Sequence, residues 1–129
     1  MNRFFFVFAL LTLTGCYNTE RNCTDFKTGT FEFNYTIDGK DKTGKFVRND
    51  SLNIDYYEGK VDSSSIRWIN DCEFILKKIN PESMSEKDAI HMKILSTQNN
   101  TYTFEYKLAV KKANRATRVE KGTATKINQ

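Results

Sequence analysis

The sequence has few of the residues on which most catalytic and metal sites depend. Its 129 residues include one histidine, His91, and three cysteines, Cys16, Cys23 and Cys72. A hydrolytic triad needs a nucleophile, a base and an orienting group, and no partner motif surrounds His91, which we expect on the solvent side of a strand. A zinc site needs clustered cysteine and histidine ligands, which these spacings do not offer. The sequence therefore predicts a protein that is not an enzyme, with no catalytic residue, metal or cofactor.

The chain also has no long helical period and no apolar run of the roughly 20 residues that a membrane-spanning helix requires. Pro81 is the single proline, and the net charge of +4 is too small to indicate nucleic acid as a partner. Aromatic residues make up 13% of the chain and are interleaved with threonine, valine and isoleucine. Such a composition favours β-strands.

Residues 1–16 have the parts of an export signal: basic Arg3, an apolar run over 4–13 and small residues at its end. Leu13-Thr14-Gly15-Cys16 resembles the bacterial lipobox. The resemblance implies that Cys16 is acylated, with palmitate among its fatty acids, and becomes the first mature residue. Several acyl chains on one residue hold a protein stably on a membrane. The expected partner of Cys16 is therefore the membrane.

This interpretation divides the chain into a signal peptide (1–15), a lipid-anchored tether (16–22) and a single β domain (23–129). Tyr17, and not aspartate, follows Cys16, which by the same resemblance favours the outer membrane of the cell envelope. Removal of the signal peptide leaves 114 residues with a net charge of +3, because Arg3 is the only charged residue lost. That length suits one domain with a modest core.

Apolar and polar residues alternate in a series of short segments separated by turn residues, as in half-buried strands. Strands are expected at 31–37, 44–48, 52–56, 90–94, 102–110 and 119–127, with two more between 64 and 79. The pattern predicts an all-β meander of about eight antiparallel strands, closed as a small barrel or strongly curved sheet. A two-sheet sandwich is the alternative. The aromatic residues expected to be buried are Phe31, Phe33, Trp68, Phe74, Tyr102, Phe104 and Tyr106.

Asn70 and Asp71, which lie between two of these strands, are residue types that strongly favour a turn. A three-residue turn over 69–71 would keep the large apolar groups on one face, whereas a two-residue turn would put Arg67 there. A single continuous strand over 65–78 would place the same residues on each face and remains the alternative. The preferred turn pairs Trp68 with Cys72 and Ile66 with Phe74.

Cys23 and Cys72 are expected to form a disulfide. Export places both in a compartment where disulfides persist. If lipid occupies Cys16, two cysteines remain and only one pairing exists. The bond would hold the first residues of the domain on its core.

Two blocks, Cys23-Thr24-Asp25-Phe26-Lys27-Thr28-Gly29-Thr30-Phe31 and Trp68-Ile69-Asn70-Asp71-Cys72-Glu73-Phe74, resemble segments of small uncharacterised lipoproteins of the Bacteroidota. A weaker third block is Asn49-Asp50-Ser51-Leu52. The resemblance implies an envelope location and a small lipocalin-like β fold. It implies no catalytic residues.

Three further patterns have simple structural explanations beside functional ones. The basic segment 107–121 is expected to be a solvated hairpin, or else to contact anionic headgroups beside the anchor. Asp71 and Glu73 are expected to be turn and solvent residues and not paired catalytic acids. Ser51 fits a short O-glycosylation pattern, although a turn in which Asp50 bonds nearby backbone explains the same residues.

The expected function is that of an uncharacterised envelope lipoprotein acting as a non-enzymatic binding or accessory module. The alternative is a lipocalin-like carrier of a small apolar ligand. The partner would accordingly be an envelope protein or a small apolar molecule. An internal cavity would favour the ligand, whereas an interior filled by Trp68, Phe74, Phe104 and Tyr106 would favour an accessory role.

Overall fold

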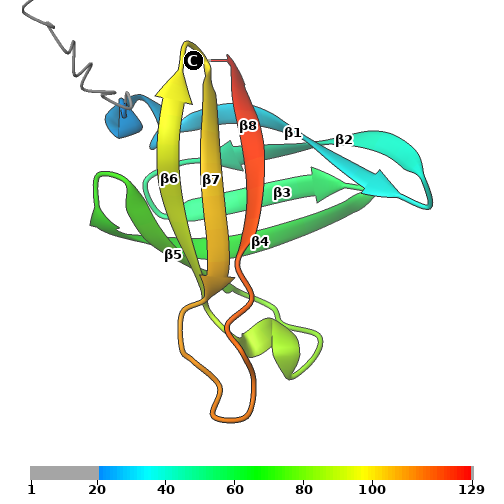
Figure 1. Ribbon diagram of the computed structural model, residues 1–129. Coiled ribbons are helices and arrows are strands. Elements are labelled where there is room, and N and C mark those ends of the chain that lie inside the picture. Colours follow the sequence, from blue (N-terminus) through cyan, green and yellow to red (C-terminus); the bar gives the residue numbers. More distant parts are fainter. Residues whose placement is uncertain (1–20, 129) are drawn as a thin grey trace, which may run out of the picture.

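Eight antiparallel strands follow one another around a closed barrel in the computed structural model, which describes residues 21–128 (Figure 1). Each strand pairs with the next, and the last pairs with the first. The predicted all-β meander and its closure into a small barrel are confirmed. The strands are β1 (Gly29–Ile37), β2 (Lys40–Arg48), β3 (Leu52–Tyr57), β4 (Lys60–Asn70), β5 (Glu73–Lys78), β6 (Ile90–Gln98), β7 (Thr101–Leu108) and β8 (Glu120–Asn128), with short 3-10 helices η1 (Cys23–Phe26) and η2 (Ser85–Lys87).

Two tight turns of the same kind join β1 to β2 and β3 to β4. Asp38 and Gly39 have φ of 52° and 73°, and Glu58 and Gly59 have 51° and 72°. Two successive residues with positive φ give the twist that a two-residue hairpin needs, and glycine adopts it at no steric cost.

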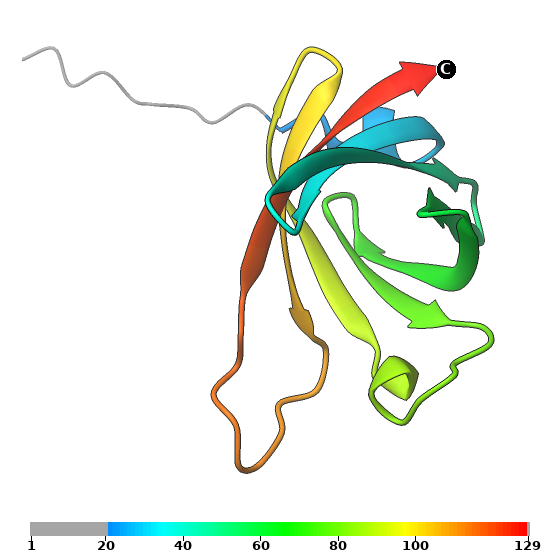
Figure 2. The same cartoon turned by 90° about the vertical axis from the view of Figure 1, so that its right-hand side faces the viewer.

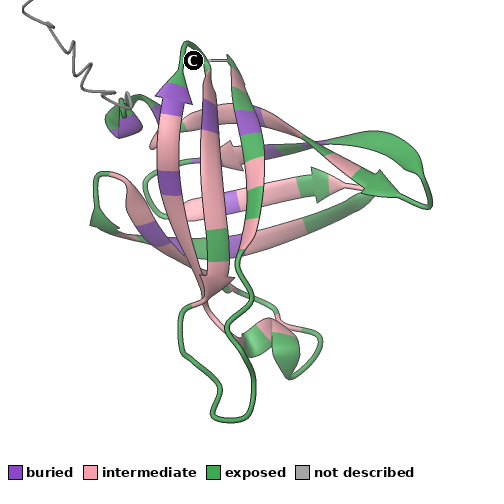
Figure 3. Cartoon of the chain, viewed as in Figure 1, coloured by how far each residue is buried: buried purple, intermediate pink, exposed green. Residues whose placement is uncertain are grey.

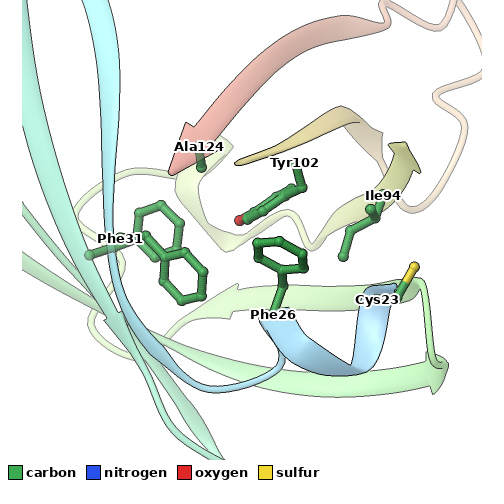
Figure 4. Packing of buried hydrophobic residues seen from close by; sticks show 7 residues of the cluster. Cys23, Phe26, Phe31, Ile94, Tyr102 and Ala124 are labelled. Atoms are coloured by element: carbon green, nitrogen blue, oxygen red, sulfur yellow. The ribbon is translucent and has the colours of Figure 1, made fainter. Parts of the chain in front are cut away.

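The packed core fills the end of the barrel that η1 covers. Phe31 stacks on Phe46 with ring centroids 4.8 Å apart, and Phe26 of η1 meets Tyr102 edge-on at 5.1 Å. Figure 4 shows these side chains converging with Ile94 and Ala124. In β6, β7 and β8 the buried positions lie toward this same end (Figure 3). We call it the closed end.

The disulfide between Cys23 and Cys72 is present, with Cα atoms 5.2 Å apart, and confirms the expected pairing. It joins η1 to the turn between β4 and β5. The residues just before η1 are also attached, because Arg21 Nε donates to the Leu95 carbonyl at 3.1 Å and the Asn22 amide to Thr97 Oγ1 at 2.8 Å. The last two residues of the predicted tether therefore lie against β6.

The register of the β4–β5 hairpin differs from the one expected. Trp68 pairs with Phe74, and not with Cys72, and a bulge lies between Trp68 and Asn70. The Asn70 side chain accepts the Cys72 amide at 2.9 Å, which fixes a tighter turn, and the exposed Ile69 takes up the extra residue. The expected pairing was wrong, yet Trp68 and Phe74 still share the inner face, with ring centroids 4.6 Å apart.

Burial of the aromatic residues was predicted only in part. Phe31, Phe74 and Tyr102 are at most 1% exposed, but Tyr106 is 37% exposed. Phe33, Trp68 and Phe104 are half-buried. The cause is that β1 pairs with β8 only as far as Phe33, so the rest of β1 and the beginning of β8 diverge at the other end. Within residues 21–128, no helix is long and apolar enough to cross a membrane.

Candidate functional site

A pocket of about 630 Å³ lies inside the barrel where β1 and β8 diverge. A second hollow of about 330 Å³ shares Phe33, Tyr35 and Asp55 with it and extends it toward the β3–β4 turn. Sites for small ligands in proteins measure about 300–1,000 Å³. The residues lining the main pocket include Phe33, Tyr35, Phe46, Arg48, Asn53, Asp55, Leu76, Met92, Tyr102, Phe104 and Tyr106.

Glycines allow two phenylalanine rings to form part of the pocket wall. Gly44 is directly opposite Phe33 on the neighbouring strand, and Gly122 is opposite Phe104. A Cβ atom at Gly44 would overlap Phe33 Cζ, and one at Gly122 would lie 2.8 Å from Phe104 Cζ. Each ring therefore occupies the space above a glycine, which keeps it against the wall and out of the pocket.

Arg48, at the end of β2, lies at the base of the pocket and is only 3% exposed. Its guanidinium donates to three different groups: Asn53 Oδ1 at 3.3 Å, the Phe26 carbonyl at 2.9 Å and the Tyr102 hydroxyl at 3.1 Å. These partners belong to β3, η1 and β7. Arg48 thus forms the boundary between the packed closed end and the hollow half of the barrel.

Aromatic rings surround the same guanidinium. Its central carbon lies 4.6 Å from the ring centroid of Phe74, 5.1 Å from that of Phe46 and 5.2 Å from that of Phe31. Such contacts stabilise a cation by about 0.5–2 kcal/mol each and so offset part of the cost of burying its charge. All the hydrogen-bond partners of Arg48 are uncharged, and within residues 21–128 it forms no ion pair.

Asp55 stands beside this group on β3. Asn53 links the two, since its amide nitrogen donates to Asp55 Oδ1 at 3.2 Å while its oxygen accepts from Arg48. Burial raises the pKa of the Asp55 carboxyl, and the Asn53 hydrogen bond and the Arg48 charge offset only part of that effect. The base of the pocket therefore combines a buried cation with a carboxyl group that protonates unusually readily.

A chain of polar contacts fastens η2 to the barrel. Tyr57 donates to Asp62 at 2.7 Å, and Lys78 lies 3.6 Å from Asp62 and 2.7 Å from Glu86 of η2. The hydrogen bond from Tyr57 lowers the pKa of Asp62, and the bond to Glu86 raises the pKa of Lys78. The loop between β5 and β6 is thus held by charged groups at one edge of the barrel.

The other residues noted in the sequence lie away from the pocket. His91 contacts Glu73 at 3.2 Å, and Asp71 pairs with Lys27 at 2.9 Å, so the two acids have separate partners. Asn49, and not Asp50, accepts the turn bonds, from the amides of Ser51 and Leu52. Cys16 is outside the described residues, so its acylation stays a prediction.

The basic segment 107–121 includes the loop between β7 and β8, which projects from the end of the barrel opposite η1 (Figure 2). Lys112 pairs with Asp88 at 3.0 Å, and Arg118 pairs with Glu120. The part of the segment between β7 and β8 is therefore a solvated loop at the end of the barrel opposite η1.

Arg48, Asn53 and Asp55 were not predicted from the sequence. The alternation of side chains along β2 could have revealed Arg48. Arg48 is two residues after Phe46 and four after Gly44, so all three lie on the same face of the strand. In the described part of the chain, no group of three or more histidine, cysteine, aspartate or glutamate residues is placed to hold a metal ion. Comparison with models of protein families, with curated proteins and with solved structures finds no match.

Proposed function

We propose that the protein is a non-enzymatic binding module that holds a small, mostly apolar molecule in the barrel. The observation that carries this proposal is the pocket of about 630 Å³. Small barrels are often filled by their own side chains. Here the closed end is filled in that way, whereas the other half leaves room for a ligand.

The chemistry of the wall supports an apolar ligand. Phe33, Phe104 and Met92 line the pocket, and Leu76 adds an aliphatic group. Burying apolar surface is worth about 25 cal/mol per Å², so a hydrocarbon body gains affinity from such a wall. The divergence of β1 and β8 leaves a route by which the ligand can enter.

In the proposed cellular setting, acylated Cys16 holds the protein on the cell envelope, and we place it at the outer membrane. Cys16 precedes Arg21 by five residues, which span at most about 18 Å. Arg21 bonds to β6 at the closed end. The end of the barrel opposite the closed end, near the β7–β8 loop, would then face away from the membrane (Figure 1).

Binding of the neutral fluorescent probe N-phenyl-1-naphthylamine to the full chain tests the proposal. We expect saturable binding of one probe per chain. Leu76→Trp should weaken binding at least about tenfold by filling the pocket, whereas Lys77→Trp, at the neighbouring exposed position, should not. Absence of saturable binding, or equal loss in both variants, would contradict the proposal.

A further inference from the structure

At the base of the pocket, Arg48, Tyr102 and Asn53 have more hydrogen-bond donors than they use. A guanidinium has five N–H donors, and Arg48 uses three of them. The Tyr102 hydroxyl accepts from Arg48, but no residue in 21–128 accepts its own hydrogen. Asn53 likewise uses one of the two donors of its amide. Four donors therefore remain around one buried charge.

Every nitrogen and oxygen atom of these three side chains already has one hydrogen-bond partner, and the four remaining hydrogens can each bond to a further acceptor. Arg48 and Asn53 are each 3% exposed and Tyr102 is 1% exposed, yet all three line the pocket. A ligand group that carries only acceptors and a negative charge would complement this arrangement. A carboxylate does so, since its two oxygens match the planar guanidinium and accept a phenol hydroxyl as well.

We propose that the ligand is an amphipathic carboxylate whose acid group binds Arg48 and Tyr102 while its hydrocarbon body lies along the pocket wall. This inference rests on the proposed function, since it assigns the head group of the molecule that the pocket holds. Asp55 does not already fill the role, because it contacts Asn53 and forms no ion pair with Arg48. Arg48 lies among aromatic rings and is only 3% exposed, and low exposure to solvent strengthens the attraction between two charges.

Trp68 provides the readout. It is the only tryptophan in the chain, and its ring centroid lies 5.9 Å from the Arg48 guanidinium carbon. The full chain, held on phosphatidylcholine vesicles, is titrated with decanoate, decanol and decylamine while Trp68 fluorescence is recorded. We expect decanoate to bind at least about tenfold more tightly than decanol, because hydrogen bonds to a charged group are strong. Decylamine should bind most weakly.

Variants locate the source of the preference. Arg48→Gln removes the charge, and Tyr102→Phe removes one donor without changing the ring, which keeps the test usable if Arg48→Gln fails to fold. Both should bring decanoate binding close to that of decanol. Lys77→Gln removes an exposed charge outside the pocket and is the matched control, which should keep the preference.

The outcomes separate the two proposals. Equal binding of decanoate and decanol, or loss of the preference in Lys77→Gln as well, overturns the carboxylate inference and leaves the binding pocket intact. Tighter binding of decylamine than of decanoate overturns the inference in the same way. Failure of decanoate and decanol alike to bind the unaltered chain overturns the proposed function itself.

Discussion

The ring of Phe33 lies across Gly44 of the neighbouring strand so closely that a single added methyl group would overlap it. Phe33 is half-buried and lines the pocket, so the space above Gly44 is what keeps the ring on the wall. The volume of the pocket thus depends on a residue that has no side chain.

Gly44→Ala should therefore lower the free energy of unfolding by about 1–3 kcal/mol, the usual cost of inserting a methyl group into a packed contact. The same substitution in a Phe33→Leu background should cost clearly less, because the clashing ring is gone. Urea unfolding of the four proteins gives the comparison. An equal cost in both backgrounds would show that Phe33 is not the neighbour that Gly44 accommodates.

The disulfide should contribute strongly to stability. Cys23 and Cys72 are 49 residues apart, and in the chain-entropy model closing such a loop stabilises the fold by about 4 kcal/mol. We expect the Cys23→Ser/Cys72→Ser double variant to unfold at a lower urea concentration and to be insensitive to reductant. The unaltered protein should shift toward the variant when reduced. Unfolding curves that coincide with and without reductant would contradict this account.

Asp55 should make stability depend on pH in a specific direction. Its pKa is raised above its ordinary value of 3.8, so the folded protein keeps a proton that the unfolded chain has released. The free energy of unfolding therefore decreases as the pH rises from the ordinary pKa of Asp55 through its raised pKa. Asp55→Asn should be more stable than the unaltered protein near pH 7, and the difference should shrink on acidification below the ordinary value.

Asp50→Asn, at an exposed turn position, is the control for this prediction. It should leave the pH profile of the urea midpoint unchanged. If Asp55→Asn destabilises the protein near pH 7, then the Asp55 charge is favourable where it lies, and the account of the pocket base is wrong.

The proposed membrane anchor is tested separately at Cys16. Mass spectrometry of the protein extracted from membranes should find a diacyl or triacyl cysteine as the first residue. Cys16→Ala should leave the precursor uncleaved or release a soluble form. An unmodified Cys16, or a mature chain that begins elsewhere, would rule out the lipoprotein assignment.

Local patterns in the sequence were enough to predict the strands, whereas the disulfide was predicted from the expected export and from the cysteine count. Phe31, Phe33 and Tyr35 recur at every second position, so β1 and its inner face followed from alternation alone. The bulge at Ile69 was not predictable, because it depends on the Asn70 side chain binding the Cys72 amide and not on the pattern of apolar residues.

The base of the pocket could not be predicted because it is assembled from distant segments. Arg48 is buried by contacts with Phe26 and Tyr102, which are 22 and 54 residues away in the chain. Tyr106 has the same inward parity as Tyr102, yet it is exposed because β1 leaves β8 at its end of the barrel. Neither the burial of Arg48 nor the exposure of Tyr106 can be read from the pattern of a single strand.

The most direct test of the binding pocket uses the two methionines of the described chain. Met92 lines the pocket, whereas Met84 lies outside it and is 77% exposed. In nuclear magnetic resonance spectra of methyl-labelled protein titrated with decanol, the Met92 methyl signal should shift and saturate while the Met84 signal stays in place. A stationary Met92 signal, or equal unsaturable shifts of both methyls, would contradict the claim that the barrel holds an apolar ligand.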